Sequence, residues 1–338
     1  MIKRLFLCLL VVCLLLSGCE LPYAPVTTPT EGESGLTVHY IDVGQADCAL
    51  LECDGEYILI DGGNVEDSSL VVSYLDKVGV ESLKAVFCSH AHEDHVGGLP
   101  GVLAVYPSEA VYAPTNTYSS DCFDDFLYYT DQQGLSVTIP KPRDRMTFGD
   151  AQVQVLGPVK SYADTNNTSL VLMVTYGETR FLFTGDMETP AETDLLDAGA
   201  DVRADVLKVG HHGSDTSSGY RFLYQVAPIY AVISVGEGNS YGHPCEPILS
   251  RLEDADATIY RTDKLGTILA CSDGKDITFT WERQVANEET VFYIGNRKSG
   301  KLHLPTCSQL PKKENQRRFD SYKEAIAAGY TPCEQCME

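Results

Sequence analysis

The chain has 338 residues, which exceeds the usual size of one domain, so one large domain with a small second one is expected. Hydrophobic residues make up 43% of it, an ordinary fraction for a folded protein, and no repeat has the length that builds a solenoid. The net charge of −23 argues against a protein that binds nucleic acid through a generally basic surface. Strand-like segments alternate with helical ones such as residues 68–78, which predicts an α/β fold.

The N-terminal residues 1–19 predict an export signal. Two positive charges precede an apolar run at residues 5–16, which is too short to span a bilayer as a retained anchor. The run leads into LSGC, which resembles the lipobox of bacterial lipoproteins and implies that Cys19 is lipidated. Residues 20–35, rich in Pro, Thr and Glu, predict a flexible tether. We therefore expect a lipoprotein on the extracytoplasmic face of the bacterial cell membrane, without a transmembrane channel in this chain.

The stretch SHAHEDHVGG, residues 89–98, concentrates three histidines and two acids. The apolar run at residues 83–89 predicts a buried strand that delivers His90 at its end. His90 and His92 then stand two apart, on the same side of an extended chain. The two glycines allow a tight turn before a short helix at residues 99–105.

Asp94 and His95 complete this stretch, so four side chains with metal-binding atoms occupy six positions. Imidazole and carboxylate groups are ligands for zinc, manganese or iron, whereas thiolates would indicate a closed structural site. Four ligands from one short segment exceed what a single catalytic metal takes. The spacing therefore predicts two metals rather than a polar surface loop.

The motif H-x-H-x-D-H after a buried strand resembles the signature of the metallo-β-lactamase superfamily. Further segments follow the order found in the nuclease-like domain of ComEC-type competence proteins: HYIDVGQADCALLE (39–52), YILIDGG (57–63), NNTSLVL (166–172), FLFTGDM (181–187), LKVGHHGS (207–214), YGHP (241–244) and YRTDKLGTI (260–268). This resemblance implies that residues 36–286 form a four-layer αβ/βα sandwich. Two mixed sheets would pack face to face with helices outside, and the site would lie on strand ends.

The resemblance also implies a ligand set for two divalent metals, Zn or Mn. Metal one would take His90, His92 and Asp186, and metal two would take Asp94, His95, Asp186 and His211. Asp186 ends an apolar strand and would bridge both metals, although such an aspartate can instead cap the next helix. Many members of the superfamily have another histidine on metal one where this chain has Asn166. Metal one is therefore expected to bind weakly or to favour manganese over zinc.

Other residues of these motifs are expected to support the centre. Those that would orient ligands or meet the substrate are Asp42, Gln45, Asp47, Asp61, Asn166, His212 and Ser214. Catalytic roles are expected for Asp94, through the second metal, and for His243. His243 would hydrogen-bond the phosphate or protonate the leaving oxygen, and the alternative is a loop histidine packed beside Pro244.

Residues 287–338 form a separate unit that predicts a structural zinc site. His303 and Cys307 are separated by three residues, and Cys333 and Cys336 by two. Two such pairs suit tetrahedral zinc, whereas a disulfide module would leave one of the three cysteines unpaired. The segment resembles the Ada-type metal-binding module, with His303 where that module has a cysteine. This departure argues against alkyl-transfer chemistry and leaves a structural zinc that helps to grip a polymer.

Six cysteines of the main domain leave two alternatives open. They are Cys48, Cys53, Cys88, Cys122, Cys245 and Cys271. In an exported domain they can form disulfides, but scattered cysteines on strand-like segments are as often buried apolar side chains.

The charge is distributed unevenly along the chain. Residues 36–286 carry 38 acidic and 15 basic residues, whereas residues 287–338 carry seven acidic and eight basic ones. Basic residues of the small domain form either a DNA-facing patch or an ordinary solvated face; they are Arg297, Lys298, Lys301, Lys312, Lys313, Arg317 and Arg318. In the acidic main domain, the metals would have to supply much of the positive field that a phosphate backbone requires.

Two cations about 3.5 to 4 Å apart suit phosphodiester hydrolysis, because they activate a shared water and stabilise both attacking and leaving oxygens. We therefore predict a surface-anchored, metal-dependent phosphodiesterase, a DNase related to competence DNA processing. One alternative is a phosphodiesterase for a non-nucleic substrate such as phosphocholine esters of cell-wall polymers, which the acidic domain suits at least as well. Another is a metal-loaded binding protein without turnover. Hydrolysis of β-lactams has no support beyond the shared metal motif.

Overall fold

The computed structural model describes residues 35–283, 293–304, 307, 309–319, 322–333 and 335–337. The predicted export signal, Cys19 and all but the last residue of the predicted tether lie outside these residues. The predicted boundary between the domains, at residues 286 and 287, lies outside them as well.

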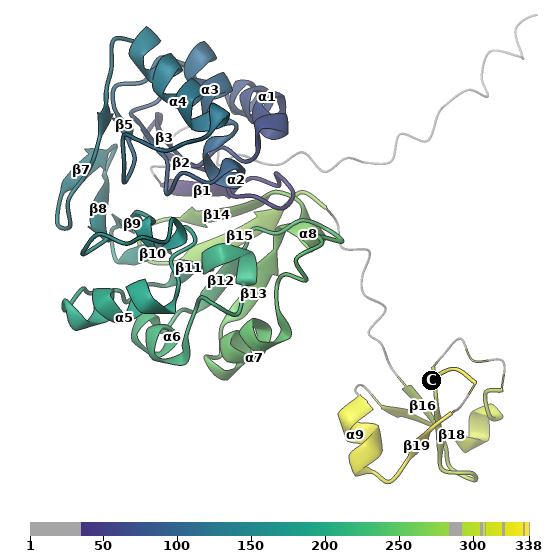
Figure 1. Cartoon of the computed structure of the whole chain (residues 1–338). Coiled ribbons are helices and arrows are strands. Elements are labelled where there is room, and N and C mark those ends of the chain that lie inside the picture. Colours follow the sequence, from purple (N-terminus) through teal and green to yellow (C-terminus); the bar gives the residue numbers. More distant parts are fainter. Residues whose placement is uncertain are drawn as a thin grey trace, which may run out of the picture. The chain divides into compact units, whose positions relative to one another are not determined.

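One of the two sheets of the main domain is a mixed sheet of eight strands (Figure 1). Its strands lie in the order β15 (Ile277–Trp281), β14 (Ile268–Ser272), β1 (Leu36–Tyr40), β2 (Ala49–Cys53), β3 (Glu56–Ile60), β4 (Ala85–Phe87), β5 (Val111–Tyr112) and β6 (Val137–Thr138). Neighbours from β15 to β3 pair antiparallel, and those from β3 to β6 pair in parallel.

A second mixed sheet has seven strands. Their order is β13 (Thr258–Arg261), β12 (Tyr230–Ile233), β11 (Val206–Lys208), β10 (Thr179–Phe183), β9 (Val171–Tyr176), β8 (Ala151–Gly157) and β7 (Arg145–Phe148). Neighbours from β13 to β10 pair in parallel, and those from β10 to β7 pair antiparallel.

The alternation of side chains along the strands explains why the sheets stack face to face. In β10, Phe181 and Phe183 point into the core that the two sheets share, where they meet Val38 and Tyr40 of β1. Leu182 between them points to the opposite face, as the two-residue period of a strand requires.

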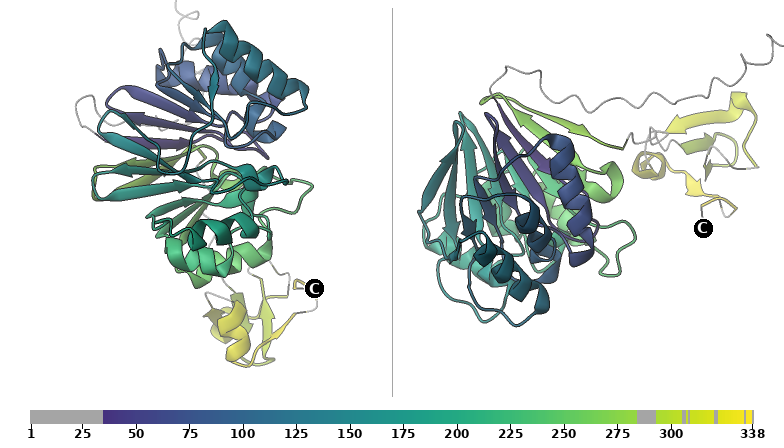
Figure 2. Two further views of the ribbon diagram at one scale, coloured as in Figure 1. Left: turned by 60° about the vertical axis from the view of Figure 1, so that its left-hand side comes forward. Right: turned by 90° about the horizontal axis from the view of Figure 1, so that it is seen from above.

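Helices cover the outer face of each sheet. The first sheet is covered by α1 (Ser68–Val78), α3 (Leu99–Val105) and α4 (Asp121–Gln132), and the second by α5 (Thr189–Asp197), α6 (Tyr220–Val226) and α7 (Glu246–Asp254). Figure 2 shows the two sheets between these helical layers. The predicted four-layer αβ/βα sandwich is confirmed, and α1 and α3 have the bounds expected from the sequence.

The segments that carry the predicted metal ligands lie at strand ends. The short helix α2 (Glu93–Val96) follows β4, Asp186 follows β10, and the turn η3 (Gly210–Gly213) follows β11. Because β10 and β11 are parallel neighbours, their carboxyl ends lie at one edge of their sheet. The N–H of Leu170 donates to the carbonyl oxygen of Ser89 across 2.8 Å, which ties the two sheets together there.

The C-terminal residues form a small four-stranded sheet of their own. Its order is β18 (Gln316–Phe319), β16 (Tyr293–Asn296), β17 (Lys301–His303) and β19 (Thr331–Pro332), and the helix α9 (Tyr322–Ala327) accompanies it. Leu302, Phe319 and Ala325 form a separate core. The remaining short elements are η1 (Val65–Asp67), η2 (Asn166–Thr168), α8 (Thr262–Leu265) and η4 (Lys313–Asn315).

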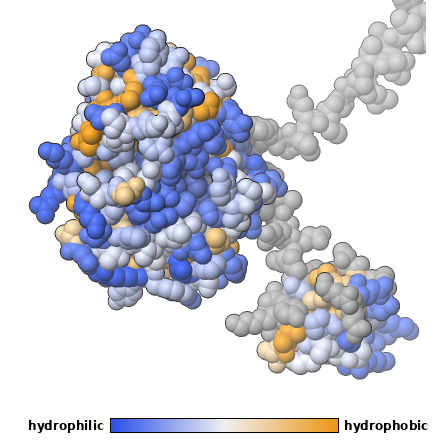
Figure 3. Space-filling model, in the orientation of Figure 1, coloured by the Kyte–Doolittle hydropathy of each residue, from blue (hydrophilic) through white to orange (hydrophobic). Residues whose placement is uncertain are grey.

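Burial of the apolar residues leaves a mostly hydrophilic face on the main domain, with only small hydrophobic patches (Figure 3). Within the described residues, no helix combines the length and apolar character needed to cross a membrane. The six main-domain cysteines are unpaired in the described structure. Four of them are buried, and these four serve as apolar side chains.

Candidate metal centre

The histidines of residues 89–95 reach the centre because β4 ends directly before them. His90 is completely buried, and its Nε2 lies 3.0 Å from Nδ1 of His92. His92 is the N-cap residue of α2, so Asp94 and His95 follow on the first turn of that helix. The two imidazoles thus present nitrogen atoms side by side.

His95 is fully buried between two carboxylates. Its Nδ1 lies 2.9 Å from Oδ2 of Asp61, and its Nε2 lies 3.2 Å from Oδ1 of Asp186. The other oxygen of Asp61 accepts the N–H of Ser89 at 2.6 Å, which fixes this carboxylate. Asp61 therefore holds the imidazole of His95 in one orientation, as carboxylates do behind metal-binding histidines.

Asp186 lies between two pairs of histidines. Its Oδ1 is 3.2 Å from Nε2 of His95 and 3.8 Å from Nε2 of His212. Its Oδ2 is 3.8 Å from Nε2 of His90 and 3.7 Å from Nε2 of His211. A carboxylate whose two oxygens face different histidine pairs is suited to bridge two cations.

The residues of the centre fit a divalent cation. Oδ1 of Asp186 and Nε2 of His95 are buried and face each other, yet neither has a hydrogen-bond partner among the described residues. Leaving a buried polar atom unpaired costs about 1–3 kcal/mol, so such atoms call for a ligand. Together with Asp94 and His212, they supply ligand atoms that all lie within 4.8 Å of one another. Imidazole and carboxylate ligands of this kind suit zinc or manganese.

The structure corrects the choice between the two adjacent histidines of η3. The sequence predicted that His211 joins Asp94, His95 and Asp186, but the structure places His212 in this group. His212 is buried, and its Nε2 lies 3.2 Å from Oδ2 of Asp94. Both histidines have a φ of 51°, in the left-handed region that residues other than glycine rarely adopt. This backbone turns their side chains in directions that sequence spacing does not reveal.

Lys208 is a residue of the centre that the sequence analysis missed. Its Nζ lies 2.8 Å from Oδ2 of Asp47, and both side chains are buried. Oδ1 of Asp47 lies 3.2 Å from Nδ1 of His212, which is also 3.0 Å from the carbonyl oxygen of Ser234. Lys208 thus holds the carboxylate that faces His212, whose Nδ1 is paired with the carbonyl oxygen of Ser234. The available signal was a lysine inside the apolar run at residues 206–209.

The pKa values of the centre reflect its concentration of carboxylates. Burial raises the pKa of Asp94, but His95 and His212 outweigh burial and lower it to about 2. Burial lowers the pKa of His212, but Asp186 and Asp47 outweigh burial and raise it to about 10. The same negative charges that hold a proton on His212 would attract a cation.

His243 lies beside the centre rather than in the ligand group. Its ring centroid is 5.7 Å from that of His211, and its Nδ1 is 3.5 Å from Nε2 of Gln45. The other amide atom of Gln45, Oε1, accepts the N–H of Gly236 at 3.1 Å, which fixes the orientation of the amide. Burial, followed by the charges of His211 and His212, lowers the pKa of His243 below 6.5.

Asp42, which was expected to orient a ligand or to meet the substrate, forms an ion pair with Arg283. Its Oδ2 lies 2.7 Å from Nη2 of Arg283, and its Oδ1 accepts the N–H of Gly44 at 3.3 Å. The ion pair connects the loop after β1 to the segment that follows β15, so Asp42 contributes to the wall around the centre.

Asn166 and Ser214 each contact a residue that lies beside the ring of His211. Nδ2 of Asn166 donates to Oε1 of Glu188 at 3.4 Å, and this oxygen lies 3.5 Å from Nδ1 of His211. Oγ of Ser214 is 3.1 Å from Oγ1 of Thr216, which lies 3.1 Å from the same nitrogen. Glu188 and Thr216 are further residues that no motif in the sequence indicated.

A groove of about 660 Å³ borders the centre. It is lined by Asp42, Val43, Gly44, Gln45, Asn64, Glu66, Asp67, Leu70, Glu93, Asp94 and Tyr241. Five of these side chains are carboxylates, and Tyr241 stacks on His243 with ring centroids 5.7 Å apart. The approach to Asp94 is therefore acidic and carries an exposed aromatic ring.

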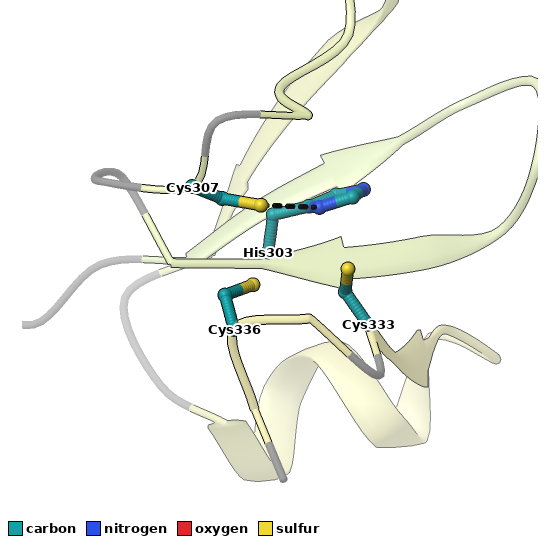
Figure 4. A group of neighbouring side chains, drawn as sticks. All are labelled: His303, Cys307, Cys333 and Cys336. Carbon is teal, nitrogen blue, oxygen red and sulfur yellow. Dashed lines mark hydrogen bonds between the residues drawn. The ribbon is translucent and has the colours of Figure 1, made fainter.

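The small domain brings its four predicted ligands together (Figure 4). His303 ends β17 and Cys333 follows β19, and Nδ1 of His303 lies 3.4 Å from Sγ of Cys307. Sγ of Cys336 completes a group whose ligand atoms all lie within 4.8 Å of one another. The N–H of Gln335 lowers the pKa of Cys333, which favours the thiolate that zinc binds.

Comparison with known families agrees with both sites. Residues 41–237, more than half of the chain, match the family model described as the metallo-beta-lactamase superfamily. The chain belongs to this superfamily. Residues 281–338 match the model described as the metal binding domain of Ada, so the C-terminal zinc-binding domain is confirmed.

Three curated relatives place this superfamily member near competence proteins. It is 31% identical over 258 residues to ComE operon protein 3 of Bacillus subtilis (strain 168). The aligned region covers 71% of this chain and 33% of that protein. It is 31% identical over 261 residues to Competence protein ComA of Neisseria gonorrhoeae, covering 75% and 34% of the two chains. Recombination protein 2 of Haemophilus influenzae is 30% identical over 240 residues, covering 68% and 28%. The chain thus spans about a third of the length of these relatives, and the resemblance to ComEC-type competence proteins is confirmed.

Proposed function

We propose that this metal-dependent hydrolase is a phosphodiesterase that cleaves DNA with two divalent cations. The observation that carries the proposal is Asp186, whose two carboxylate oxygens face the pairs His95–His212 and His90–His211. Similarity to proteins named for competence and recombination supports DNA as the substrate.

Each residue of the centre would have a separate role in this reaction. Two cations held between the histidine pairs would lower the pKa of a shared water and neutralise charge on the phosphoryl oxygens. Asp186 would keep the two positions at a fixed separation. Asp94, with Oδ2 3.2 Å from His212, would complete the second position. Lys208 and Asp61 would keep the imidazoles oriented from behind.

His243 is proposed to donate a hydrogen bond to the phosphate or to the leaving oxygen. Because Oε1 of Gln45 is occupied by the N–H of Gly236, the amide presents Nε2 as a donor to Nδ1 of His243. An imidazole that accepts at Nδ1 carries its proton on Nε2. The low pKa of His243 favours this neutral form, which still donates from Nε2.

Two substitutions test the division between metal binding and substrate contact. Asp186→Ala removes the shared carboxylate, so both metal content and hydrolysis should collapse. His243→Ala should keep the metals and slow cleavage of DNA by roughly a hundred- to ten-thousandfold. A nitrophenyl phosphodiester needs little help at its leaving oxygen and should recover much of this loss. Tyr224→Ala, at an exposed position of α6, is the control and should change neither quantity.

Other outcomes of the same experiment would change the assignment. If His243→Ala lost metal, His243 would be a ligand. If it slowed both substrates equally, its contact would be with the phosphate rather than the leaving oxygen. If Asp186→Ala kept its metals, the two-cation proposal would be wrong.

The acidic groove favours a second candidate substrate. Five carboxylates and Tyr241 line it, and such a surface attracts a quaternary ammonium group through charge and cation–π contact. This candidate is a phosphocholine ester of a cell-wall polymer. A panel of plasmid DNA, RNA, a phosphocholine ester and a β-lactam, each with Mn²⁺ or Zn²⁺, decides between the substrates. Faster cleavage of the phosphocholine ester than of DNA would replace the leading proposal.

The proposed location is the extracytoplasmic face of the bacterial cell membrane, through a lipid on Cys19. This proposal rests on the LSGC sequence after the apolar run. Cys19→Ala should therefore release the protein from the membrane fraction or stall removal of the signal. Unchanged fractionation and processing of the variant would contradict the anchor.

A further inference from the structure

We propose that the two adjacent histidines of η3 serve different cations: His212 the one beside Asp94 and His95, and His211 the one beside His90 and His92. His211 would thereby supply the ligand that the asparagine at position 166 leaves out. This inference rests on the proposed two-cation function and concerns metal binding, which can be measured without a substrate.

The distances around Asp186 are the first evidence that His211 serves the cation beside His90 and His92. Nε2 of His211 lies 3.7 Å from Oδ2 of Asp186, and Nε2 of His90 lies 3.8 Å from the same oxygen. Nδ1 of His92 is 3.0 Å from Nε2 of His90. Zinc–nitrogen bonds of about 2.0–2.1 Å bring the ligand atoms of one ion within about 3 to 3.5 Å of each other. Side-chain rotations that shorten these contacts would let His90, His92, His211 and Oδ2 surround one ion, whereas the ligand atoms of the His212 group already lie within 4.8 Å of one another.

The far side of the His211 ring has the surroundings of a metal ligand. Its Nδ1 lies 3.1 Å from Oγ1 of Thr216 and 3.5 Å from Oε1 of Glu188. Histidines that bind metals usually donate their second ring nitrogen to a carboxylate or another oxygen, which fixes the tautomer and the ring orientation. A proton on Nδ1 leaves the lone pair of Nε2 free toward Asp186.

Asn166 contributes to this arrangement indirectly. Its Nδ2 donates to Oε1 of Glu188 at 3.4 Å, and Nδ2 of Asn167 donates to Oε2 at 3.4 Å. The N–H of Glu188 in turn donates to Oδ1 of Asn167 at 3.2 Å. The segment that offers a histidine ligand in many superfamily members thus positions the carboxylate behind His211.

The backbone of η3 makes the division between the two cations possible. His211 and His212 both have a φ of 51°, a strained conformation that persists only where surrounding contacts enforce it. The N–H of His211 donates to the carbonyl oxygen of Gly185 at 3.2 Å, and its own carbonyl oxygen accepts the N–H of Ser214 at 2.8 Å. These contacts bring consecutive side chains to opposite oxygens of one carboxylate.

The test counts metals in the full mature protein with its C-terminal zinc in place. Samples are equilibrated with Mn²⁺ and analysed for bound manganese and zinc by mass spectrometry. The wild type should hold about two manganese ions, and His211→Ala and His212→Ala should each hold about one. The affinity for the lost ion should fall roughly a hundredfold or more, and Glu188→Gln should weaken the same ion about tenfold.

Double variants identify which ion each histidine binds. His92→Ala combined with His211→Ala should lose no more manganese than either variant alone, because both act on one ion. His212→Ala combined with His211→Ala should lose both ions. Tyr224→Ala, at an exposed position of α6, is the control and should keep about two ions. Unchanged zinc content and far-UV circular dichroism verify that the variants fold.

The result that overturns the inference is a His211→Ala variant that binds both manganese ions with unchanged affinity. His211 would then contact the substrate rather than a metal. Complete loss of manganese from the His92→Ala, His211→Ala pair would also contradict it, by placing His211 on the other ion. If the wild type binds two ions but cleaves no phosphodiester, the proposed function fails while this assignment stands.

Discussion

Among single residues, Glu192 shows how burial changes the pKa of a carboxyl group outside the metal centre. Its carboxylate lies in the first turn of α5 and accepts the N–H groups of Ser218 at 2.5 Å and Gly219 at 3.0 Å. Burial raises its pKa from 4.5 to about 7, and these two hydrogen bonds only partly oppose the shift. The loop that it holds continues from Thr216, a neighbour of His211.

The raised pKa of Glu192 predicts a pH-dependent stability. Since the folded-state pKa exceeds the unfolded one, the stability that Glu192 contributes is complete below pH 4.5 and is lost as the pH rises through 7. Relative to Glu192→Gln, the metal-free wild type should lose about 3 kcal/mol of unfolding free energy between pH 4.5 and 8. Urea unfolding of both proteins, followed by the fluorescence of the single tryptophan, Trp281, measures this. A difference that stays constant with pH would contradict it.

At the scale of elements, β11 connects the fold to the metal centre through Lys208. The pairing of Lys208 with Asp47 joins β11 of the second sheet to the loop between β1 and β2 of the first. Both groups are buried, so each charge depends on the other for compensation.

Breaking this pair should be costly. Lys208→Met removes the closest cationic partner of Asp47 and should lower the unfolding free energy by about 3 kcal/mol. It should also weaken metal binding, because the carboxylate of Asp47 lies 3.2 Å from Nδ1 of His212 and acts on this ligand from behind. The double variant Asp47→Asn, Lys208→Met should recover much of the stability but not the metal affinity. Denaturant unfolding and manganese titration check both effects, and equal stability of Lys208→Met and the wild type would show that the pair is not structural.

At the scale of the whole molecule, the two domains have separate hydrophobic cores. The main domain has three clusters of buried residues, and the C-terminal domain has its own around Leu302 and Phe319. The small core alone is modest, so the zinc group is expected to supply much of the stability of its domain.

Removal of one zinc ligand should therefore affect one domain only. Cys333→Ser should lose about one equivalent of zinc and loosen the C-terminal domain. The unfolding transition of the main domain, reported by Trp281, should keep its midpoint. Cys271→Ser, at an unpaired cysteine of β14, is the matched control and should retain its zinc. Unchanged zinc content in Cys333→Ser would argue for a disulfide or an empty site.

The sequence by itself determined the features that depend on near neighbours. The alternating strands and the helices at residues 68–78 and 99–105 follow from local periodicity. The four-layer sandwich was predicted from the resemblance of the motifs to the metallo-β-lactamase superfamily. The C-terminal ligand group could be predicted because each half is a closely spaced pair in the sequence. The cluster at residues 90–95 could be predicted for the same reason.

Only the tertiary structure decided how distant residues complete the metal centre. The choice of His212 over His211 depends on two positive φ angles and on Asp94, which lies 118 residues earlier in the chain. Lys208 meets Asp47 across 161 residues, and its role depends on an ion pair that only folding buries. No sequence spacing indicates such contacts, because the residues meet only when the two sheets stack. Their ion pairs strengthen at the same step, since the dielectric around the charges falls on burial.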